Sequence, residues 1–176
     1  MPFLIYQEGK IKVEVSNCKG EYIMDCVIRK AELDDYEQVL KIMNQAQQLH
    51  VEWRPDIYKR NDSLLSREIF GKKVDDETFF VAEMSNIVVG IMELVYRHIE
   101  TPAHVTRNVI FIDVMAVDEA NRRKGVGHLL FEKVKELKEI LHYDGIELQV
   151  NAKNKAAYEM YSKYGFTEKS ISMELL

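Results

Sequence analysis

The clearest hydrophobic pattern in this sequence is a strand followed by an amphipathic helix in its second half. An almost unbroken apolar run covers residues 109–117, which is typical of a buried strand. Apolar residues then recur at spacings of 4, 4, 3 and 4, as on one face of a helix: Val126, Leu130, Val134, Leu137 and Leu141. The segment between them is Arg122-Arg123-Lys124-Gly125-Val126-Gly127. The pattern predicts a strand, a glycine turn and a helix in that order.

A second strand and helix follow in the same half. Apolar residues at 146, 148 and 150 alternate with polar ones, which predicts a strand with one buried face, and Gly145 is the expected C-cap of the preceding helix. A helix is predicted over residues 154–164, ending at Gly165, with a last strand over 166–175. The crossover from Val109 to Val150 predicts a parallel pair of strands.

The first half contains mostly short strands. One amphipathic helix is predicted after Asp34, with Val39, Ile42, Met43, Ala46 and Leu49 on one face. The other predicted elements are strands near 3–6, 10–15, 24–29, 78–83 and 87–96, a Glu8-Gly9 turn, a short helix near 63–70 and a hairpin turn at Ser85-Asn86. Strands and helices in this order predict a single α+β domain over residues 1–176, with residues 1–20 as an N-terminal extension of strands.

Composition excludes several classes of protein. A chain of 176 residues can bury roughly 70% of its unfolded surface without disulfides or metals, and its net charge of −5 argues against a nucleic-acid partner. Cys18 and Cys26 form no CxxC pair and have no histidine at metal-ligand spacing, so no metal site is expected. No apolar run is long enough for a membrane span, and no signal segment is recognised. We therefore expect a cytoplasmic protein without membrane attachment.

The glycine turn has the composition of an anion site. Two glycines let backbone N–H groups point inward, the helix that follows adds the positive end of its dipole, and three cations supply charge. The NTPase phosphate loop requires GxxxxGK[ST], which is absent, and the dinucleotide fingerprint requires a third glycine where this chain has Leu130. The pattern that remains is RxxGxG.

A second motif accompanies RxxGxG. The segment from Asn154 to Phe166 reads NKAAYEMYSKYGF, and at about 100° per residue its positions 154, 157, 158 and 161 lie on one broad face of a helix. This segment resembles the NxxAxxxYxxxGF helix of the GNAT superfamily of N-acetyltransferases, and RxxGxG resembles the acyl-CoA-binding motif of the same family. The resemblance covers about 60 residues, from Val109 to Phe166. It implies a mixed, largely antiparallel sheet flanked by helices, with a parallel pair splayed around the coenzyme.

The resemblance also implies where acetyl-CoA, the expected cosubstrate, binds. Its pantetheine arm would pair with backbone groups of strand 109–117, and its pyrophosphate would rest on the amides of the turn. The implied coenzyme-binding residues are Met115, Ala116, Val117, Arg122, Arg123, Lys124, Gly125, Val126, Gly127, His128 and Asn154. For Asn154, a helix cap is the structural alternative.

Acetyl transfer to an amine needs a proton for the departing thiolate and a base for the amine. Tyr161 is the candidate acid, because a tyrosine is protonated at neutral pH; its structural alternative is a core aromatic with its hydroxyl at the rim. Asp113, a carboxylate within an apolar strand, is either the base, acting through water, or a structural hydrogen-bonding group. Glu93 is the reserve base.

The expected function is transfer of acetyl from acetyl-CoA to a primary amine in a ternary complex, without a covalent intermediate. The acceptor is a small molecule or a protein amino group. Trp53 and Tyr58 stand in a loop interrupted by Pro55, where they either face the substrate or pack on the core. The alternative function is an inactive acyl-CoA sensor of the same fold. A homodimer is compatible with the sequence.

Overall fold

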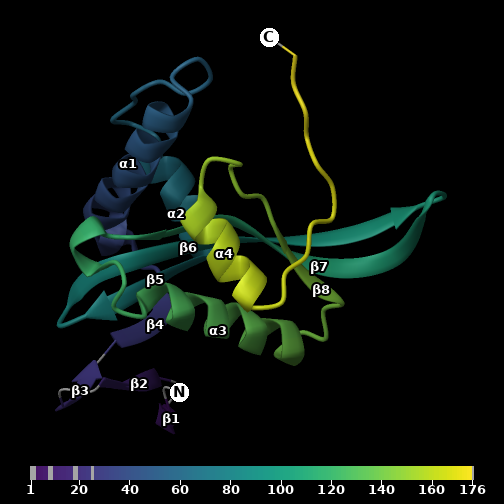
Figure 1. The fold of residues 1–176 in the computed structure, drawn as a ribbon. Coiled ribbons are helices and arrows are strands. Elements are labelled where there is room, and N and C mark those ends of the chain that lie inside the picture. The colour runs from purple at the N-terminus through teal and green to yellow at the C-terminus, as the bar shows by residue number, and fades with distance from the viewer. Residues whose placement is uncertain (1–2, 8–9, 18–19, 25, 176) are drawn as a thin grey trace.

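The computed structural model describes residues 3–7, 10–17, 20–24 and 26–175. Over these residues the strands form two sheets, one of three strands in the order β1-β2-β3 and one of five in the order β4-β5-β6-β7-β8 (Figure 1). The strands are β1 (Phe3–Gln7), β2 (Lys10–Asn17), β3 (Gly20–Met24), β4 (Cys26–Lys30), β5 (Phe79–Met84), β6 (Ile87–Thr101), β7 (His104–Val117) and β8 (Gly145–Leu148). The architecture is α+β, as the sequence predicts.

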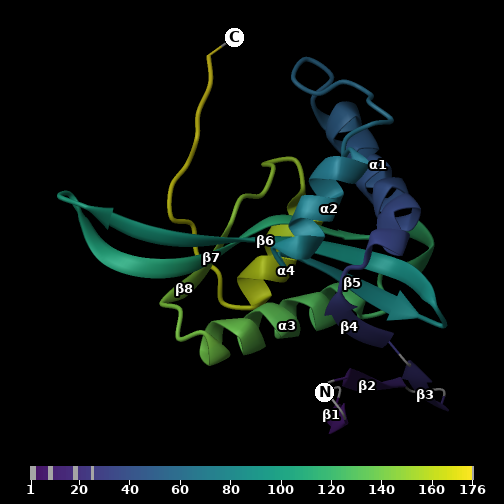
Figure 2. The same ribbon diagram turned by 180° about the vertical axis from the view of Figure 1, so that it is seen from behind.

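Helices cover both faces of the larger sheet. They are α1 (Tyr36–Trp53), α2 (Arg67–Asp75), α3 (Val126–Ile140) and α4 (Lys155–Lys163), with short 3₁₀ turns η1 (Leu33–Asp35) and η2 (Glu119–Asn121). Figures 1 and 2 show α1 and α2 on one side of the sheet and α3 and α4 on the other. Within the described residues, no helix is both long and apolar enough to cross a membrane.

The pairing of the larger sheet changes from antiparallel to parallel at its last strand. Strands β4 to β7 pair antiparallel, with a hairpin turn at Ser85 and Asn86, whose φ angles are 50° and 63°. Strand β8 pairs parallel with β7, from Val109 opposite Gly145 to Ile112 opposite Leu148. Both the hairpin and the parallel crossover are confirmed. The β6–β7 hairpin also extends beyond the sheet as a long arm (Figure 1).

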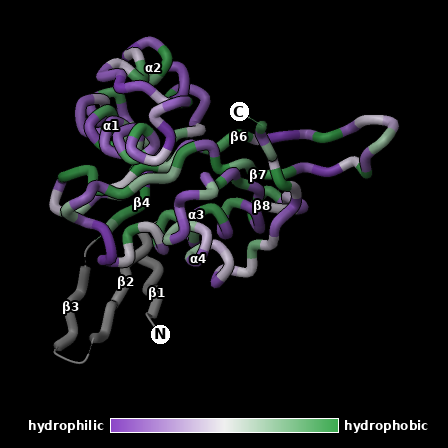
Figure 3. The backbone as a smooth tube through the Cα atoms, turned by 45° about the horizontal axis from the view of Figure 1, so that its top comes forward, coloured by the Kyte–Doolittle hydropathy of each residue, from purple (hydrophilic) through white to green (hydrophobic). Residues whose placement is uncertain are grey.

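Two hydrophobic cores fill the space between the sheet and its helices. In Figure 3 the hydrophobic segments gather in the central strands, and hydrophilic ones dominate the outer surface of α1 and α2. The core under α3 contains Ile110, Leu130 and Val134, which are fully buried. The core under α1 and α2 contains Val39, Phe70 and other buried side chains. Burial of these apolar side chains is the main contribution to the stability of the fold.

A β-bulge in β7 allows this strand to contribute to both cores. Glu93 of β6 pairs with Val114, and the next residue pairs with Ile112, so Asp113 is the extra residue. Ile112 packs in the core under α3, whereas Val114 packs in the core under α1. In a regular strand, two residues separated by one position share a face. The bulge therefore changes which face of β7 is apolar and leaves Asp113 exposed to solvent.

The start of α1 is fixed by an ion-pair group. Asp35 is buried, and its two carboxylate oxygens accept hydrogen bonds of 2.7 and 2.9 Å from Arg29 of β4. The same guanidinium donates to Glu83 of β5 at 2.7 Å. Burial raises the pKa of Asp35, but the hydrogen bonds from Arg29 and from the Glu32 amide lower it by more. The net pKa of Asp35 therefore lies below its ordinary value. These contacts join α1 to the first two strands of the larger sheet.

A second buried carboxylate ties α1 to the end of β7. Asp118 accepts hydrogen bonds from Gln45 at 3.0 Å and Asn121 at 2.9 Å, and an ion pair of 3.2 Å from Lys41. Gln45 also accepts a hydrogen bond from the amide of Glu119 at 3.0 Å. Burial raises the pKa of Asp118, but these donors lower it by more, so its net pKa lies below the ordinary value. Asp118 thus positions the segment that leads into the glycine turn.

Several local predictions are wrong. Strand β3 was not predicted, and the second helix begins at Arg67 rather than near 63, because Ser66 caps it by accepting from the amide of Ile69. Gly145 is not a C-cap: it opens β8, and the left-handed residue after α3 is His142, with φ 54°. The Glu8-Gly9 turn and Cys18 lie outside the described residues.

The predicted last strand is also wrong for the single chain. Residues 166–175 pair with no strand among the described residues. A strand exists only where a neighbouring strand supplies its hydrogen bonds, and the alternation of side chains in the sequence cannot supply that neighbour.

Gly90 offers a test of packing between β6 and α3. A Cβ added there would lie 2.9 Å from Val126 Cγ1 and 3.2 Å from Ala82 Cβ. We expect Gly90→Ala to destabilise the protein by about 1–3 kcal/mol through overpacking. In α2, where a Cβ on Gly71 would meet Leu33 at an ordinary 3.5 Å, Gly71→Ala should stabilise by up to about 1 kcal/mol. Urea unfolding measures both, and equal effects would contradict the packing argument.

The pH dependence of the free energy of unfolding tests the role of Asp118. Its folded pKa lies below the unfolded value of about 3.9, so the stabilisation that it provides is complete above that unfolded value and is lost as the pH falls from there through the lower folded pKa. Asp118→Asn should cost about 1–3 kcal/mol at neutral pH, because an acceptor in the network becomes a donor. The variant should then lose less stability than wild type between neutral pH and about pH 3. The control is Asp34→Asn, at an exposed position, whose urea unfolding should follow the wild-type pH curve.

Candidate functional site

The candidate site begins at the point where β7 extends beyond the end of its pairing with β8. The last parallel pair joins Ile112 and Leu148, but β7 extends to Val117, so the residues after Ile112 pair only with β6 within the described chain. Five residues of β7 therefore have an unpaired edge that faces the gap left by β8. Backbone N–H and C=O groups on such an edge can pair with an extended ligand. Met115, Ala116 and Val117 lie on this stretch.

The glycine turn follows directly and leads into α3. Arg123 and Gly125 both have left-handed backbone, with φ angles of 62° and 88°. Gly125 is the N-cap of α3, and no side chain caps this helix. In contrast, side chains cap α2 and α4. The first amides of α3, at Val126, Gly127 and His128, thus lack a side-chain acceptor, as expected for a helix start that receives an anion.

The cations of the turn lie at its surface. Arg122, Arg123 and Lys124 are exposed. The Arg122 Nε donates to the carbonyl of Val117 at 3.1 Å, and Lys124 donates to the Asn121 side chain at 2.9 Å. Three cations at the positive end of a helix dipole are unfavourable unless an anion is bound beside them. The predicted residues of the turn are therefore brought together in one electropositive site.

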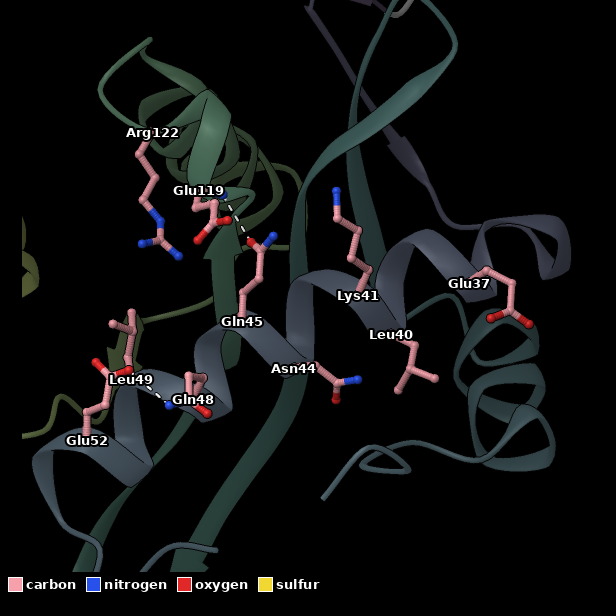
Figure 4. Close-up of a pocket in the computed structure, with 10 residues that line it drawn as sticks. All are labelled: Glu37, Leu40, Lys41, Asn44, Gln45, Gln48, Leu49, Glu52, Glu119 and Arg122. Carbon is pink, nitrogen blue, oxygen red and sulfur yellow. Dashed lines mark hydrogen bonds between the residues drawn. The ribbon is translucent and has the colours of Figure 1, made fainter. Parts of the chain in front are cut away.

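A cavity of about 720 Å³ adjoins this turn (Figure 4). Arg122 and Glu119 line one side of it, and α1 lines the other. The lining residues from α1 are Glu37, Leu40, Lys41, Asn44, Gln45, Gln48, Leu49 and Glu52. Apart from Arg122, none of the residues predicted from the sequence lines this cavity. The carboxylates and side-chain amides of α1 were not predicted, because only the fold brings the polar face of this helix opposite the turn.

Tyr161 lies on α4 with its side chain mostly buried. Its ring packs edge-on against Phe166, with 5.5 Å between ring centroids. Burial, with a smaller contribution from Tyr164, raises the pKa of Tyr161 to about 12. The phenol is therefore protonated at neutral pH, and its O–H group can donate a hydrogen bond. A proposed acid must be protonated in this way before the reaction.

Asn154 and Tyr164 flank α4, and Tyr164 connects the end of this helix to α3. Asn154 caps α4 by accepting from the Ala157 amide at 3.2 Å, so the structural alternative for Asn154 holds, while its amide N–H₂ group takes no part in the cap. His128 Nδ1 and the Tyr164 hydroxyl lie 2.6 Å apart. Tyr164 was not predicted as a site residue, although it stands three positions after Tyr161 and shares its helix.

The two candidate bases differ in their surroundings. Asp113 is exposed at the bulge, next to the unpaired stretch of β7. Glu93 is buried and forms an ion pair with Lys73 of α2. Glu93 lines a second cavity, of about 480 Å³, which includes Lys73 and other residues of α2. A buried carboxylate that is paired with a partly buried lysine is held in place by that pair, so Glu93 is the less available of the two.

Trp53 and Tyr58 form an aromatic cluster with His50. The ring of His50 lies 5.6 Å from that of Trp53 and 5.0 Å from that of Tyr58, and all three side chains are partly buried. Burial lowers the pKa of His50 below its ordinary value. The prediction that Trp53 stands in the loop is wrong, because Trp53 is the last residue of α1. Only Tyr58 comes from the loop, and it packs against this end of the helix while each ring keeps some exposed surface.

The sequence of this chain matches a family model and a curated relative. Residues 75–168 match the family described as Acetyltransferase (GNAT) domain. An uncharacterized N-acetyltransferase of Methanocaldococcus jannaschii, MJ1207, is 32% identical over 99 residues, which is 56% of this chain and 43% of that protein. The chain thus spans less than half the length of this curated relative.

Solved structures show the same fold. A mutant of the BH1408 protein from Bacillus halodurans has a TM-score of 0.77 at 29% identity, over 85% of this chain and 98% of that chain. The aminoglycoside N-acetyltransferase AAC(6')-Iy, solved in complex with CoA, has a TM-score of 0.64 at 14% identity, over 92% of this chain and 98% of that chain, which is a likeness of fold alone. Since the family match covers more than half of the sequence, the chain belongs to the GNAT acetyltransferase family.

Proposed function

We propose that this protein transfers the acetyl group of acetyl-CoA to a primary amine in a ternary complex. The observation that carries the proposal is the unpaired stretch of β7, which ends in a glycine turn and a helix start without a side-chain cap. An extended thioester with a pyrophosphate matches both parts, since a strand edge binds an extended arm and a helix N-terminus binds an anion. The family membership of the chain supports the same reaction.

In this proposal the donor is bound mainly through the backbone. The pantetheine arm pairs with Met115, Ala116 and Val117, and the pyrophosphate accepts from the amides of residues 123–128. Arg122, Arg123 and Lys124 supply charge, which requires Arg122 to exchange its contact with the Val117 carbonyl for the phosphate. The amide group of Asn154 that is not used in the helix cap is free to contact the donor.

The chemical step needs a proton donor beside the sulfur. The amine attacks the thioester carbonyl, an N–H near Val117 stabilises the oxyanion, and the C–S bond breaks as the thiolate leaves. Tyr161 gives its proton to the thiolate, and the amine gives one of its protons to the base. A phenol with a pKa of about 12 is protonated at neutral pH, so its O–H group can donate to the sulfur as negative charge develops there.

We assign the base to Asp113 acting through water, because its exposed carboxylate stands at the bulge of the strand that is proposed to hold the donor. Glu93 is the reserve, and its ion pair with Lys73 makes it the weaker candidate. The acceptor is a primary amine of a small molecule or of a protein. Trp53 and Tyr58, at the end of α1, are proposed to contact it. Several structural neighbours are aminoglycoside acetyltransferases, which supports a small-molecule amine without identifying it.

Tyr161→Phe tests the proposed acid. It should lower kcat by about 10²–10⁴-fold while the affinity for acetyl-CoA changes little, because only the proton is removed. The matched control is Tyr158→Phe on the same helix, whose hydroxyl contacts Glu168 at 3.1 Å, and this variant should keep full activity. The measurement is thiol release from acetyl-CoA with a panel of amines. Unchanged turnover in Tyr161→Phe would remove Tyr161 from its role, and coenzyme binding without turnover on any amine would favour an acyl-CoA sensor.

Gly127→Ala tests the position of the pyrophosphate. A Cβ there would lie 3.9 Å from Val117 and 4.0 Å from Met160, which is ordinary contact, so the fold should tolerate the change. If the pyrophosphate lies against this amide, the added methyl group should weaken CoA binding by about tenfold or more, equivalent to 1.4 kcal/mol. Calorimetric titration of CoA and thermal unfolding of the same sample measure the two effects. Full affinity in a stable variant would place the pyrophosphate elsewhere.

A further inference from the structure

A contact between His128 and Tyr164 joins the start of α3 to the end of α4. His128 Nδ1 and the Tyr164 hydroxyl oxygen lie 2.6 Å apart, and the two rings are stacked at an interplanar angle of 13°. His128 lies in the first turn of α3, and Tyr164 is the C-cap of α4. A ring protonated on Nε2 accepts from the phenol, whereas a ring protonated on Nδ1 donates to it, so either tautomer keeps the contact. The contact links the glycine turn to the helix of Tyr161.

Helix α4 is held less firmly by burial than α3 is. Five residues of α3 are buried, whereas none of the nine residues of α4, all of which the structure describes, is fully buried. Burial of an apolar face is the main interaction that fixes a helix on a protein. The position of α4 therefore depends more on individual contacts at its ends.

An aromatic cluster extends the contact from Tyr164 to Tyr161. The Tyr164 ring packs on the buried Phe131 of α3, with 4.3 Å between ring centroids. Phe166 packs on Phe131 and on Tyr161, with 5.5 Å between centroids in each case. The Phe166 amide also donates to the Tyr161 carbonyl at 3.1 Å. The Tyr161 ring and the end of α4 thus belong to one cluster, which the Tyr164 hydroxyl bonds to the first turn of α3.

We propose that Tyr164 is a positioning residue for the proposed acid, Tyr161. The inference rests on the proposed function, because it gives Tyr164 the task of placing the Tyr161 hydroxyl beside the thioester sulfur. His128 serves both parts of the site: its amide is one of those that receive the pyrophosphate, and its ring bonds to Tyr164. A displacement of about 1 Å at a reacting group can cost on the order of 10²-fold in rate. One hydrogen bond at the end of α4 is therefore enough to affect the acid.

A role in packing alone leads to a different expectation for Tyr164. Burial raises the pKa of Tyr164, so its hydroxyl is protonated at neutral pH and serves as a hydrogen-bonding group. Tyr164→Phe removes this hydroxyl but keeps the ring on Phe131, so it opens no cavity in the cluster. If Tyr164 only packs, the variant keeps the wild-type kcat. If Tyr164 positions the acid, kcat falls although the fold is unchanged.

The kinetics of acetyl transfer separate these two roles. Tyr164→Phe should lower kcat by about 10–100-fold and change the KM for acetyl-CoA by less than about threefold, because the contacts to the donor remain. In a protein that already carries Tyr161→Phe, the same substitution should have no further effect on kcat, since the acid that it positions is absent. Tyr158→Phe, on the same helix, should behave as wild type. An unchanged kcat in Tyr164→Phe, or an equal loss with and without the Tyr161 hydroxyl, overturns the inference.

Amide hydrogen exchange tests the same link without turnover. The amides of residues 164–166 donate to carbonyls of α4, so their exchange rates report on the end of this helix. CoA added to the wild type should slow the exchange of these amides as well as that of the first turn of α3. In Tyr164→Phe the amides of 164–166 should exchange about three- to tenfold faster, and CoA should slow only those of α3.

Two substitutions of His128 provide a matched pair for the exchange measurement. His128→Asn places an amide group close to the position of Nδ1 and should keep the slow exchange of residues 164–166, whereas His128→Leu, of similar size, should lose it. If CoA slows the amides of α3 but not those of 164–166 in the wild type, the inference is overturned while the donor site stands. A wild type that binds no CoA refutes the proposed function and this inference with it, so the two failures give different results.

Discussion

The site depends on a change of pairing along one strand. β7 has a neighbour on both sides up to Ile112 and only β6 beyond that point. At the same position the bulge at Asp113 shifts the strand by one residue, so Ile112 and Val114 pack in different cores. Without the bulge, the apolar side chains after Ile112 would point to the opposite face of the sheet from the one on which they pack. Strand β7, which carries the unpaired edge of the site, therefore packs against a hydrophobic core on each of its faces.

Helix α1 keeps the end of this strand in place. Asp118, directly after β7, is buried and bonded to Gln45 and Lys41 of α1, so the turn that follows starts from a fixed position. The start of α1 is in turn bonded through Asp35 to Arg29. These contacts fix where the turn with its exposed cations begins, ahead of a helix start that no side chain caps.

The proposed reaction divides its tasks among separate elements. Strand β7 and the glycine turn hold the donor, α4 carries the acid, and α1 with the loop after it faces the acceptor. The raised pKa of Tyr161 follows from the packing of α4 against the core, because burial disfavours the phenolate. The same packing that stabilises the helix therefore keeps the acid protonated.

The sequence by itself determined the α+β class, the glycine turn and the helix of Tyr161. These features depend on local chemistry, namely hydrophobic periodicity, left-handed glycine at Gly125 and Gly165, and fixed motif spacing. Only the tertiary structure decided the bulge at Asp113, the pairing of Glu93 with Lys73 and the polar cavity along α1, because each depends on which distant segments meet. The same reason explains the incorrect last strand: alternation in residues 166–175 specifies an apolar face, but a strand needs a neighbour that lies outside its own sequence.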